Sequence, residues 1–227
     1  MKKAFSMLEL VFVIVVIGIL ALAVISKNDN SKLMQAAVQL VAHIRYTQHL
    51  AMVDDRFKVN DTAWYKSRWT ILFNKDNNAD DKYAYTIFTD ESKTGNPDYK
   101  EIANDPSKSG KLLSGGFAGL AKLDIKKLDG ANPEQFIGTK ELNIGRTYGV
   151  ISVNFSSSCS YYKSEKISFD YQGRPLKGSM SSYNKAYMKN RLIQETCVIT
   201  LNASEGSVEI SIEPETGYVH ISSTTIL

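Results

Sequence analysis

The chain has 227 residues, of which 43% are hydrophobic and 22% are charged, and its formal net charge is +3 at pH 7. That length suffices for a domain with a buried core, so one main domain is the expectation. A net charge so close to zero excludes a protein that holds nucleic acid or anionic lipid through its overall field, and any such affinity must be local.

The first predicted element is an apolar run from Phe5 to Ile25, preceded by Lys2 and Lys3. Its length is close to the ~20 apolar residues with which a helix crosses a bilayer, and the lysines predict a cytoplasmic N-terminus. We therefore expect a single-pass protein of the bacterial inner membrane with a periplasmic domain over residues 58–227. Glu9 lies inside the run, where a carboxylate costs at least ~2.5 kcal/mol and needs a cation.

The stretch KKAFSMLELVFVIVVIGIL resembles the N-terminus of type IV pilins and pseudopilins. In that family a prepilin peptidase removes a short basic leader after a small residue, methylates the new amine, and leaves glutamate as the fifth residue. The resemblance implies a leader over 1–4, processing and N-methylation at Ala4 and Phe5, and assembly through Glu9, which the Phe5 amine of a neighbouring subunit would neutralise. Ala4 departs from the usual glycine. The alternative is a plain signal anchor, which explains the apolar length but not the acid.

Residues 26–57 form an amphipathic stretch, which the resemblance implies is the second half of a long N-terminal helix. Apolar residues at helical spacing predict one packed face; they are Leu33, Ala37, Leu40, Val41, Ile44, Ala51 and Met52. Ser31 is a candidate N-cap. His43 and His49 lie on different helix faces, so we expect histidines at the surface or at its edge and no shared metal site.

Strand-type residues begin at Trp64. The stretches WYKSRWTILF and YAYTIF are rich in aromatic and β-branched residues, and NKDNNADDK between them indicates a hairpin. Asp76, Asn78 and Asp80 imitate the first ligand positions of a calcium loop. Because Asp81 replaces its glycine and Ile87 its glutamate, we expect a turn and no metal.

Residues from Thr89 to Gly119 are rich in Gly, Pro, Ser, Asn and Lys, which predicts a long surface loop. Its DPSKSGKL segment is similar to a phosphate-binding loop, but Asp105 replaces the first glycine and Leu112 the hydroxyl residue. No nucleotide or other cofactor is expected.

The C-terminal half predicts short antiparallel strands in LNIGRTYGVISVNF, KISFDYQGRP, CVITLNASEGSVEISIE and GYVHIS. The expected fold class is α+β and pilin-like, with a long N-terminal helix, transmembrane in its first half, packed on antiparallel sheets. The spacing of the strands, together with four residues in and between them, resembles that of minor pseudopilins and pilins of the GspH and FimT type. The four residues are Phe169, Gly173, Pro175 and Gly217. The alternative is that these are residue types common in strands and turns of any protein, with no family meaning.

Cys159 and Cys197 both lie in the part expected to be exported, where disulfides form. A bond between them closes a loop of about 39 residues, worth roughly 4 kcal/mol in the chain-entropy model. The alternative is two small buried thiols.

Basic residues alternate with tyrosines between Cys159 and Arg191, a composition that can contact phosphates and stack bases. The candidate DNA-binding residues are Lys163, Lys166, Arg174, Lys177, Lys185, Lys189 and Arg191. In the family resemblance, FimT-type pilins that take up DNA use basic residues near the C-terminus. The alternative is a solvated, lysine-bearing loop.

Three short motifs match those of penicillin-binding serine enzymes: Ser160-Tyr-Tyr-Lys163, Ser182-Tyr-Asn184 and Lys93-Thr-Gly95. In that family Lys-Thr-Gly comes last and on a strand, whereas here it comes first and in the Gly/Pro-rich loop. With no other nucleophile or metal motif, an enzyme is not expected.

The sequence thus favours a minor pseudopilin or minor pilin, a structural subunit of a periplasmic filament in a type II secretion or type IV pilus-related system. Its expected partners are other pilins, the prepilin peptidase, the inner-membrane assembly platform and membrane lipid. The alternatives are a DNA-binding minor pilin of a natural-transformation apparatus and an anchored domain that never polymerises.

Overall fold

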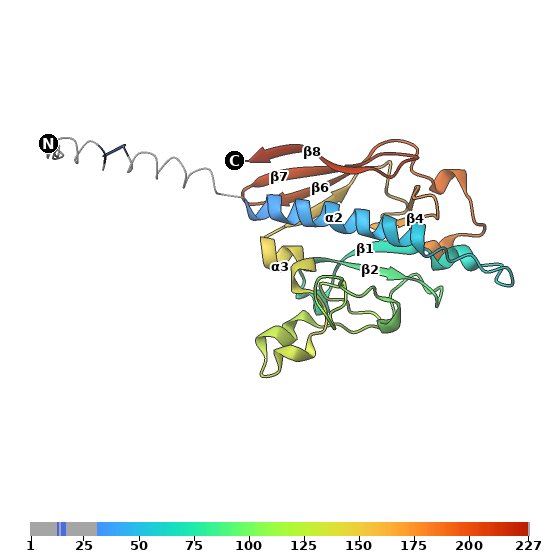
Figure 1. The fold of residues 1–227 in the computed structure, drawn as a ribbon, viewed down its shortest axis with the longest axis horizontal. Coiled ribbons are helices and arrows are strands. Elements are labelled where there is room, and N and C mark those ends of the chain that lie inside the picture. Colours follow the sequence, from blue (N-terminus) through green and yellow to red (C-terminus); the bar gives the residue numbers. More distant parts are fainter. Residues whose placement is uncertain (1–12, 14, 17–30, 227) are drawn as a thin grey trace, which may run out of the picture. The chain divides into compact units, whose positions relative to one another are not determined.

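The computed structural model describes residues 13, 15, 16 and 31–226, and residues 32–227 form one compact unit. In this unit the helix α2 (Lys32–Val53) lies against two antiparallel four-stranded sheets, with strand orders β2-β1-β4-β5 and β3-β6-β7-β8 (Figure 1). A short helix, α3, spans Ile144–Tyr148. The strands are β1 (Trp69–Lys75), β2 (Tyr83–Thr89), β3 (Ser152–Phe155), β4 (Lys166–Phe169), β5 (Pro175–Lys177), β6 (Cys197–Ala203), β7 (Gly206–Ile212) and β8 (Val219–Ile226).

The predicted hairpin of the first sheet is confirmed. β1 and β2 pair from Trp69 opposite Thr89 to Lys75 opposite Tyr83. In the turn, Asp76 Oδ1 accepts hydrogen bonds from the amides of Asn78 and Ala79, at 2.9 and 3.1 Å. Asp76 is thus a turn cap. Among the described residues, no group of three or more His, Cys, Asp or Glu side chains is placed to hold a metal.

Two segments predicted as strand are helical turns instead. Residues Trp64–Ser67 form a 3-10 turn, and β1 begins only at Trp69. The start of LNIGRTYG is α3, because the Asn143 side chain accepts a hydrogen bond from the Arg146 amide and Gly149 ends the helix in the left-handed conformation, at φ 76°.

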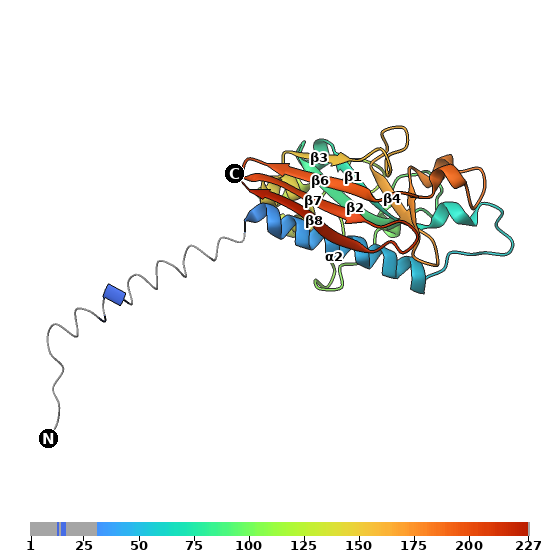
Figure 2. The ribbon, with the colours of Figure 1, turned by 90° about the horizontal axis from the view of Figure 1, so that it is seen from above.

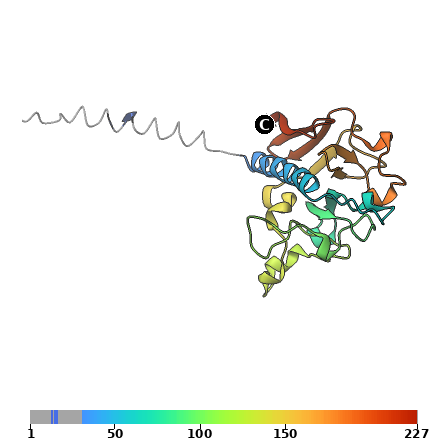
Figure 3. The same cartoon turned by 45° about the vertical axis from the view of Figure 1, so that its right-hand side comes forward.

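The apolar face of α2 packs on both sheets. In Figures 1 and 3 the helix runs between β7 and β8 on one side and β1 on the other, and it contacts all three strands. Its buried residues are Leu33, Ala36, Ala37, Leu40, Val41, Ile44, Thr47 and Ala51. The predicted face is therefore confirmed except for Met52, which is 54% exposed.

α2 begins at Lys32, next to the candidate N-cap Ser31, and ends at Val53. Residues 26–30 of the predicted amphipathic stretch lie outside the described residues. At the start of the described helix, the Leu33 amide donates to the Glu205 carboxylate in the β6–β7 turn, at 2.6 Å, where a negative charge favours a helix N-terminus. At the other end, Asp55 Oδ1 accepts from the Phe57 amide at 3.1 Å. Such a side-chain bond to the backbone competes with the helix, which ends at Val53.

The prediction that residues 89–119 form a surface loop is wrong in one respect, because this segment covers the first sheet. It pairs with the outer edge of β2: the Ile87 amide donates to the Leu113 carbonyl, and the Ala103 amide donates to the Ile87 carbonyl, both at 2.9 Å. Its apolar residues and those of the following turns pack on the second face of β1 and β2 (Figure 3). A sheet buried on both faces needs such a layer.

The predicted pilin-like fold class is wrong. The long helix of the described residues is α2, with 22 residues, and two four-stranded antiparallel sheets make up most of the remaining regular structure. The described residues are mostly β, and the long helix among them spans Lys32–Val53 where a helix over 5–57 was expected.

The predicted single-pass localisation in the inner membrane is also contradicted, since within the described part of the chain no helix combines the length and apolar character that a bilayer crossing requires. The predicted leader 1–4 lies outside the described residues. So does the predicted span 5–25, apart from residues 13, 15 and 16.

Gln48 joins a hairpin turn of each sheet to α2. Its side-chain amide donates to the Gly173 carbonyl in the β4–β5 turn and to the Thr216 carbonyl in the β7–β8 turn, both at 2.8 Å. Gly173 and Gly217 have positive φ angles of 80° and 62°. The Phe169 ring is fully buried and lies against Gly217. Three residues that carry the second resemblance therefore meet at one helix side chain.

We expect Gly217→Ala to lower the free energy of unfolding by about 1–3 kcal/mol, because its φ strains an alanine and the added Cβ would overlap the Gly173 carbonyl oxygen and the Gln48 amide. Urea unfolding measures this. Gly149→Ala is the matched control, since Gly149 has φ 76° and nothing within 4 Å of an added Cβ. Equal losses in the two variants would show that the Gln48 contact is unimportant.

Candidate functional site

The residues predicted for processing and assembly, Ala4, Phe5 and Glu9, lie outside the described residues. Their roles therefore stay predictions, as does the division of the chain at residues 4, 25 and 57. The other predicted sites fall in the described unit.

The predicted disulfide is confirmed. Cys159 and Cys197 are bonded, with Cα atoms 5.1 Å apart, and neither is exposed. The bond ties the loop after β3 to the first residue of β6. A second link lies beside it, since Ser156 Oγ accepts from the Val198 amide at 3.0 Å. Free thiols, the alternative, are thus excluded.

Four of the seven candidate DNA-binding cations are bound by groups of the protein itself. Lys166 Nζ donates to the Gly95 carbonyl, and burial lowers the pKa of this lysine against the opposing effect of Asp90. Lys177 Nζ donates to the Ser158 carbonyl at 2.7 Å. Arg174 forms an ion pair with the buried Asp170 at 2.8 Å.

Arg191 is the most buried of the four, at 4% exposure. Its guanidinium carbon lies 3.4 Å from the ring centroid of Tyr161 and 4.8 Å from that of Tyr183, and Nη2 donates to Ser182 Oγ at 2.9 Å. A cation stacked between aromatic rings is stabilised by their faces. Arg191 therefore holds the loops together and is closed to phosphate.

A second stacked arginine, Arg68, was not found from the sequence. It is 4% exposed, and its guanidinium carbon lies 5.3 Å from the Trp64 ring centroid and 5.0 Å from that of Tyr187. Burial lowers its pKa, while Tyr187 and Asp170 raise it. Three tyrosines of the stretch that suggested base stacking, Tyr161, Tyr183 and Tyr187, thus pack on arginines of the domain. Tyr162 and Tyr171 stay exposed.

Three candidate cations stay exposed: Lys163, Lys185 and Lys189. Lys189 lines a polar hollow of about 220 Å³ next to the disulfide loop, together with Ser158, Lys177 and Gln194 and with one acidic residue, Glu195. Hydroxyl, amide and ammonium donors are the groups that contact phosphate oxygens. This hollow is the part of the predicted surface that keeps the chemistry of a phosphate contact.

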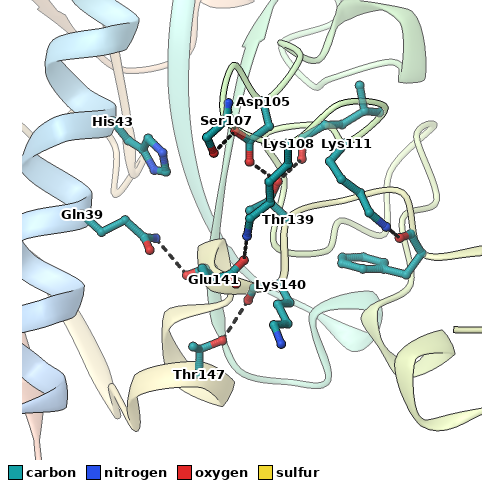
Figure 4. A network of polar contacts seen from close by, with 12 residues as sticks. Gln39, His43, Asp105, Ser107, Lys108, Lys111, Thr139, Lys140, Glu141 and Thr147 are labelled. Atoms are coloured by element: carbon teal, nitrogen blue, oxygen red, sulfur yellow. Dashed lines mark hydrogen bonds and ion pairs between the residues drawn. The ribbon is translucent and has the colours of Figure 1, made fainter. Parts of the chain in front are cut away.

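The segment similar to a phosphate-binding loop is filled by its own side chains (Figure 4). Asp105 Oδ1 accepts from the Ser107 amide and hydroxyl at 2.8 and 2.6 Å, and Thr139 Oγ1 donates to Oδ2 at 2.8 Å. Burial raises the pKa of Asp105, but these hydrogen bonds outweigh it and lower the pKa overall. Lys108 pairs with Glu141 at 2.5 Å, and Lys111 Nζ donates to a backbone carbonyl. Both lysines are thus occupied.

Beside this segment, α2 carries a half-buried polar pair toward the loops. Figure 4 shows Gln39 and His43 on the same side of the helix, facing Glu141 and Asp105. Gln39 Nε2 donates to the hydroxyl of fully buried Tyr85 at 2.8 Å, and that hydroxyl lies 2.6 Å from His43 Nδ1. Burial lowers the pKa of His43 and so favours its neutral ring. Of the two histidines predicted at surface or edge positions, His49 is exposed and His43 is half-buried.

We expect acid to destabilise the domain through His43. Burial lowers its pKa, with Asp105 opposing and Lys108 assisting, so the unfolded chain takes up the proton first. Stability is complete above the ordinary histidine pKa of about 6.5 and is lost as the pH falls from there through the lowered folded-state pKa. Melting temperatures between pH 7.5 and 5 should fall less steeply in His43→Gln. The control His49→Gln should keep the wild-type slope, and parallel curves for all three proteins would refute the assignment.

The residues that match serine-enzyme motifs do not form that active site. Ser160–Lys163 is a turn with left-handed backbone at Tyr162 and Lys163, whereas the nucleophile motif requires a helix. Lys93 Nζ pairs with Asp61 at 2.6 Å, and Ser182 Oγ accepts from Arg191. The expectation that the protein is not an enzyme stays a prediction.

No known protein family, characterised protein or solved structure matches this chain.

Proposed function

We propose that this chain is a structural assembly subunit, a minor pseudopilin or minor pilin of a type II secretion or type IV pilus-related filament. The observation that carries the proposal is the order of residues at the N-terminus, where small Ala4 precedes Phe5 and Glu9 interrupts an apolar run. A buried carboxylate is costly unless it is paired. A subunit whose Phe5 amine meets the Glu9 of its neighbour supplies that pair, and a plain apolar segment has no use for the acid.

The Cys159–Cys197 disulfide supports the proposal, because stable disulfides are typical of proteins from oxidising compartments. The rigid body beneath it also suits an assembly subunit. Its two sheets share one core with α2, so contacts made on either sheet are transmitted to the helix through packed side chains.

The mass of the mature chain tests the proposal. We expect a chain that begins at Phe5, with one added methyl group, when a prepilin peptidase is co-expressed, and an uncut Met1 without it. An N-terminus that does not depend on the peptidase would overturn the proposal. In a second experiment, Glu9→Gln should leave this cleavage intact while abolishing crosslinks to partner pilins, since the variant keeps the size of the side chain and removes its charge.

A DNA-binding minor pilin is the second candidate function, favoured by the polar hollow beside the disulfide loop. Charge reversal of Lys163, Lys185 and Lys189 should weaken DNA binding and flatten its dependence on salt, because each lost phosphate contact lowers the salt slope by about one. Lys127→Glu, an exposed lysine in another loop, is the control. Equal affinity in all variants would dismiss DNA as the ligand.

A further inference from the structure

The two edges of the first sheet are covered by irregular segments of the chain. β2 is bordered by the segment that carries Ala103 and Leu113. On the opposite edge, β5 is bordered by the segment before β6, where the Ile193 amide donates to the Pro175 carbonyl at 3.1 Å. An open sheet edge exposes unpaired amides and carbonyls, so covering it prevents unwanted pairing.

The second sheet ends on one side in β8, an eight-residue strand that pairs with β7 alone. Figures 1 and 2 show β8 as the outermost strand of this sheet. Only the start of its outer edge is satisfied, since Arg45 of α2 donates to the Val219 carbonyl at 3.0 and 2.5 Å. Beyond that residue, no described segment borders the outer edge of β8. The residues Ser222, Ser223, Thr224 and Thr225 are all exposed.

This edge has one feature that protects sheet edges, a bulge at Ser222 where the β7–β8 register shifts, and it lacks the others. Short edge strands, proline and lysine are the common devices, and β3 at the other end of the sheet has only four residues. β8 is twice as long, and its sequence VHISSTTI contains no proline, lysine, arginine or acid. In a chain with 22% charged residues, an uncharged open edge of this length points to a strand-pairing surface.

We propose that β8 pairs antiparallel with β8 of a second copy of this chain, which joins two sheets across a two-fold axis. An uncharged strand places no like charges opposite each other when it pairs with its own copy, and Ser and Thr side chains make favourable cross-strand pairs. Antiparallel pairing of identical strands is self-complementary and closed, as an isologous contact must be. A partner recognised by charge would instead need a charged edge. Each added hydrogen bond contributes only about 1 kcal/mol net, so the dimer is weak and depends on concentration.

Single cysteines along β8 test the proposal in the full chain. Both native cysteines are bonded to each other, so a cysteine introduced at position 222, 223, 224 or 225 is the free thiol. Under mild oxidation we expect disulfide-linked dimers mainly at one of these positions, the one nearest the two-fold axis. Antiparallel pairing separates the two copies of any other residue by about 6.8 Å along the strand for each step from the axis, which is too far for a disulfide. Asn154→Cys, exposed on the short edge strand β3, is the control and should give about tenfold less dimer. A yield that is equally low at all five positions would overturn the proposal.

Charge variants identify the partner. Lysine at both residues that flank the crosslinking position, which are Ser223 and Thr225 when that position is Thr224→Cys, should suppress the crosslink about tenfold through repulsion between copies. Glutamate at both flanking positions should do the same. Mixing the two variants should restore the dimer, because opposite charges then face each other. Failure of the mixture would assign the edge to another protein or to residues 1–31 of the same chain, against the proposal. The pairing does not rest on processing at Phe5, and Glu9→Gln should leave the β8 crosslink unchanged.

Discussion

Replacing both Cys159 and Cys197 by alanine is expected to lower the free energy of unfolding by about 4 kcal/mol, because the bond closes a loop of about 39 residues in the unfolded chain. Both residues are completely buried, and the bond holds the loop after β3 against the start of β6. For a domain of this size that loss corresponds to a melting temperature lower by ~8–16 °C. Calorimetry measures both quantities.

Reduction of the wild-type protein provides the control for this prediction. Dithiothreitol should bring the wild-type melting temperature close to that of the double variant and should leave the variant unchanged. If the reduced protein and the variant both stayed within about 1 kcal/mol of the oxidised wild type, the loop would be held by its packing and not by the bond.

Asp170→Asn is expected to cost about 3 kcal/mol, because removing one partner leaves buried positive charge uncompensated. Asp170 is 1% exposed. Its Oδ1 accepts from the amides of Gln172 and Arg174 at 3.0 and 2.9 Å, and its Oδ2 accepts from Arg174 Nε at 2.8 Å. It also raises the pKa of the buried Arg68. The asparagine keeps the shape and one acceptor, so the loss reports the charge.

Asp129→Asn is the matched control, since Asp129 pairs with Arg146 but its side chain is 62% exposed. An exposed pair contributes about 1 kcal/mol or less. Urea unfolding of the two variants should therefore differ by about 2 kcal/mol. Similar small losses in both would mean that water reaches Arg68 and Arg174 once Asp170 is neutral.

Local patterns predicted the hairpins and the disulfide. Alternation of apolar and polar residues identified β6 and β7, and turn residues identified the connection of β1 to β2. The short helix α3 was missed although its signals were present, because Asn143 and Gly149 are a typical cap and stop. The aromatic residues around Trp64 favoured a strand, and the tertiary stacking of Arg68 on that ring selected a turn instead.

The fate of the basic residues could not be predicted from one sequence. Lys166 is bound 71 residues away, at Gly95, and Lys177 is bound 19 residues away, at Ser158. No local sequence pattern predicts such distant pairings. Basic residues that stay exposed and basic residues that bond within the protein therefore look the same in the sequence. The network of Gln39, His43 and Tyr85 escaped prediction for the same reason, whereas the residues proposed for processing rest on the N-terminal pattern alone.

The two hydrogen bonds of the Gln48 side chain also bear on folding during synthesis on the ribosome, because they join segments that are made at different times. Its two acceptors, Gly173 and Thr216, lie 125 and 168 residues further along the chain. Ribosomes add about 5–20 residues per second. The last hairpin turn that α2 binds is therefore made roughly ten to thirty seconds after α2 itself. The part of its apolar face that packs on β7 and β8 is uncovered for that time, which makes the nascent chain a natural client for a holding chaperone.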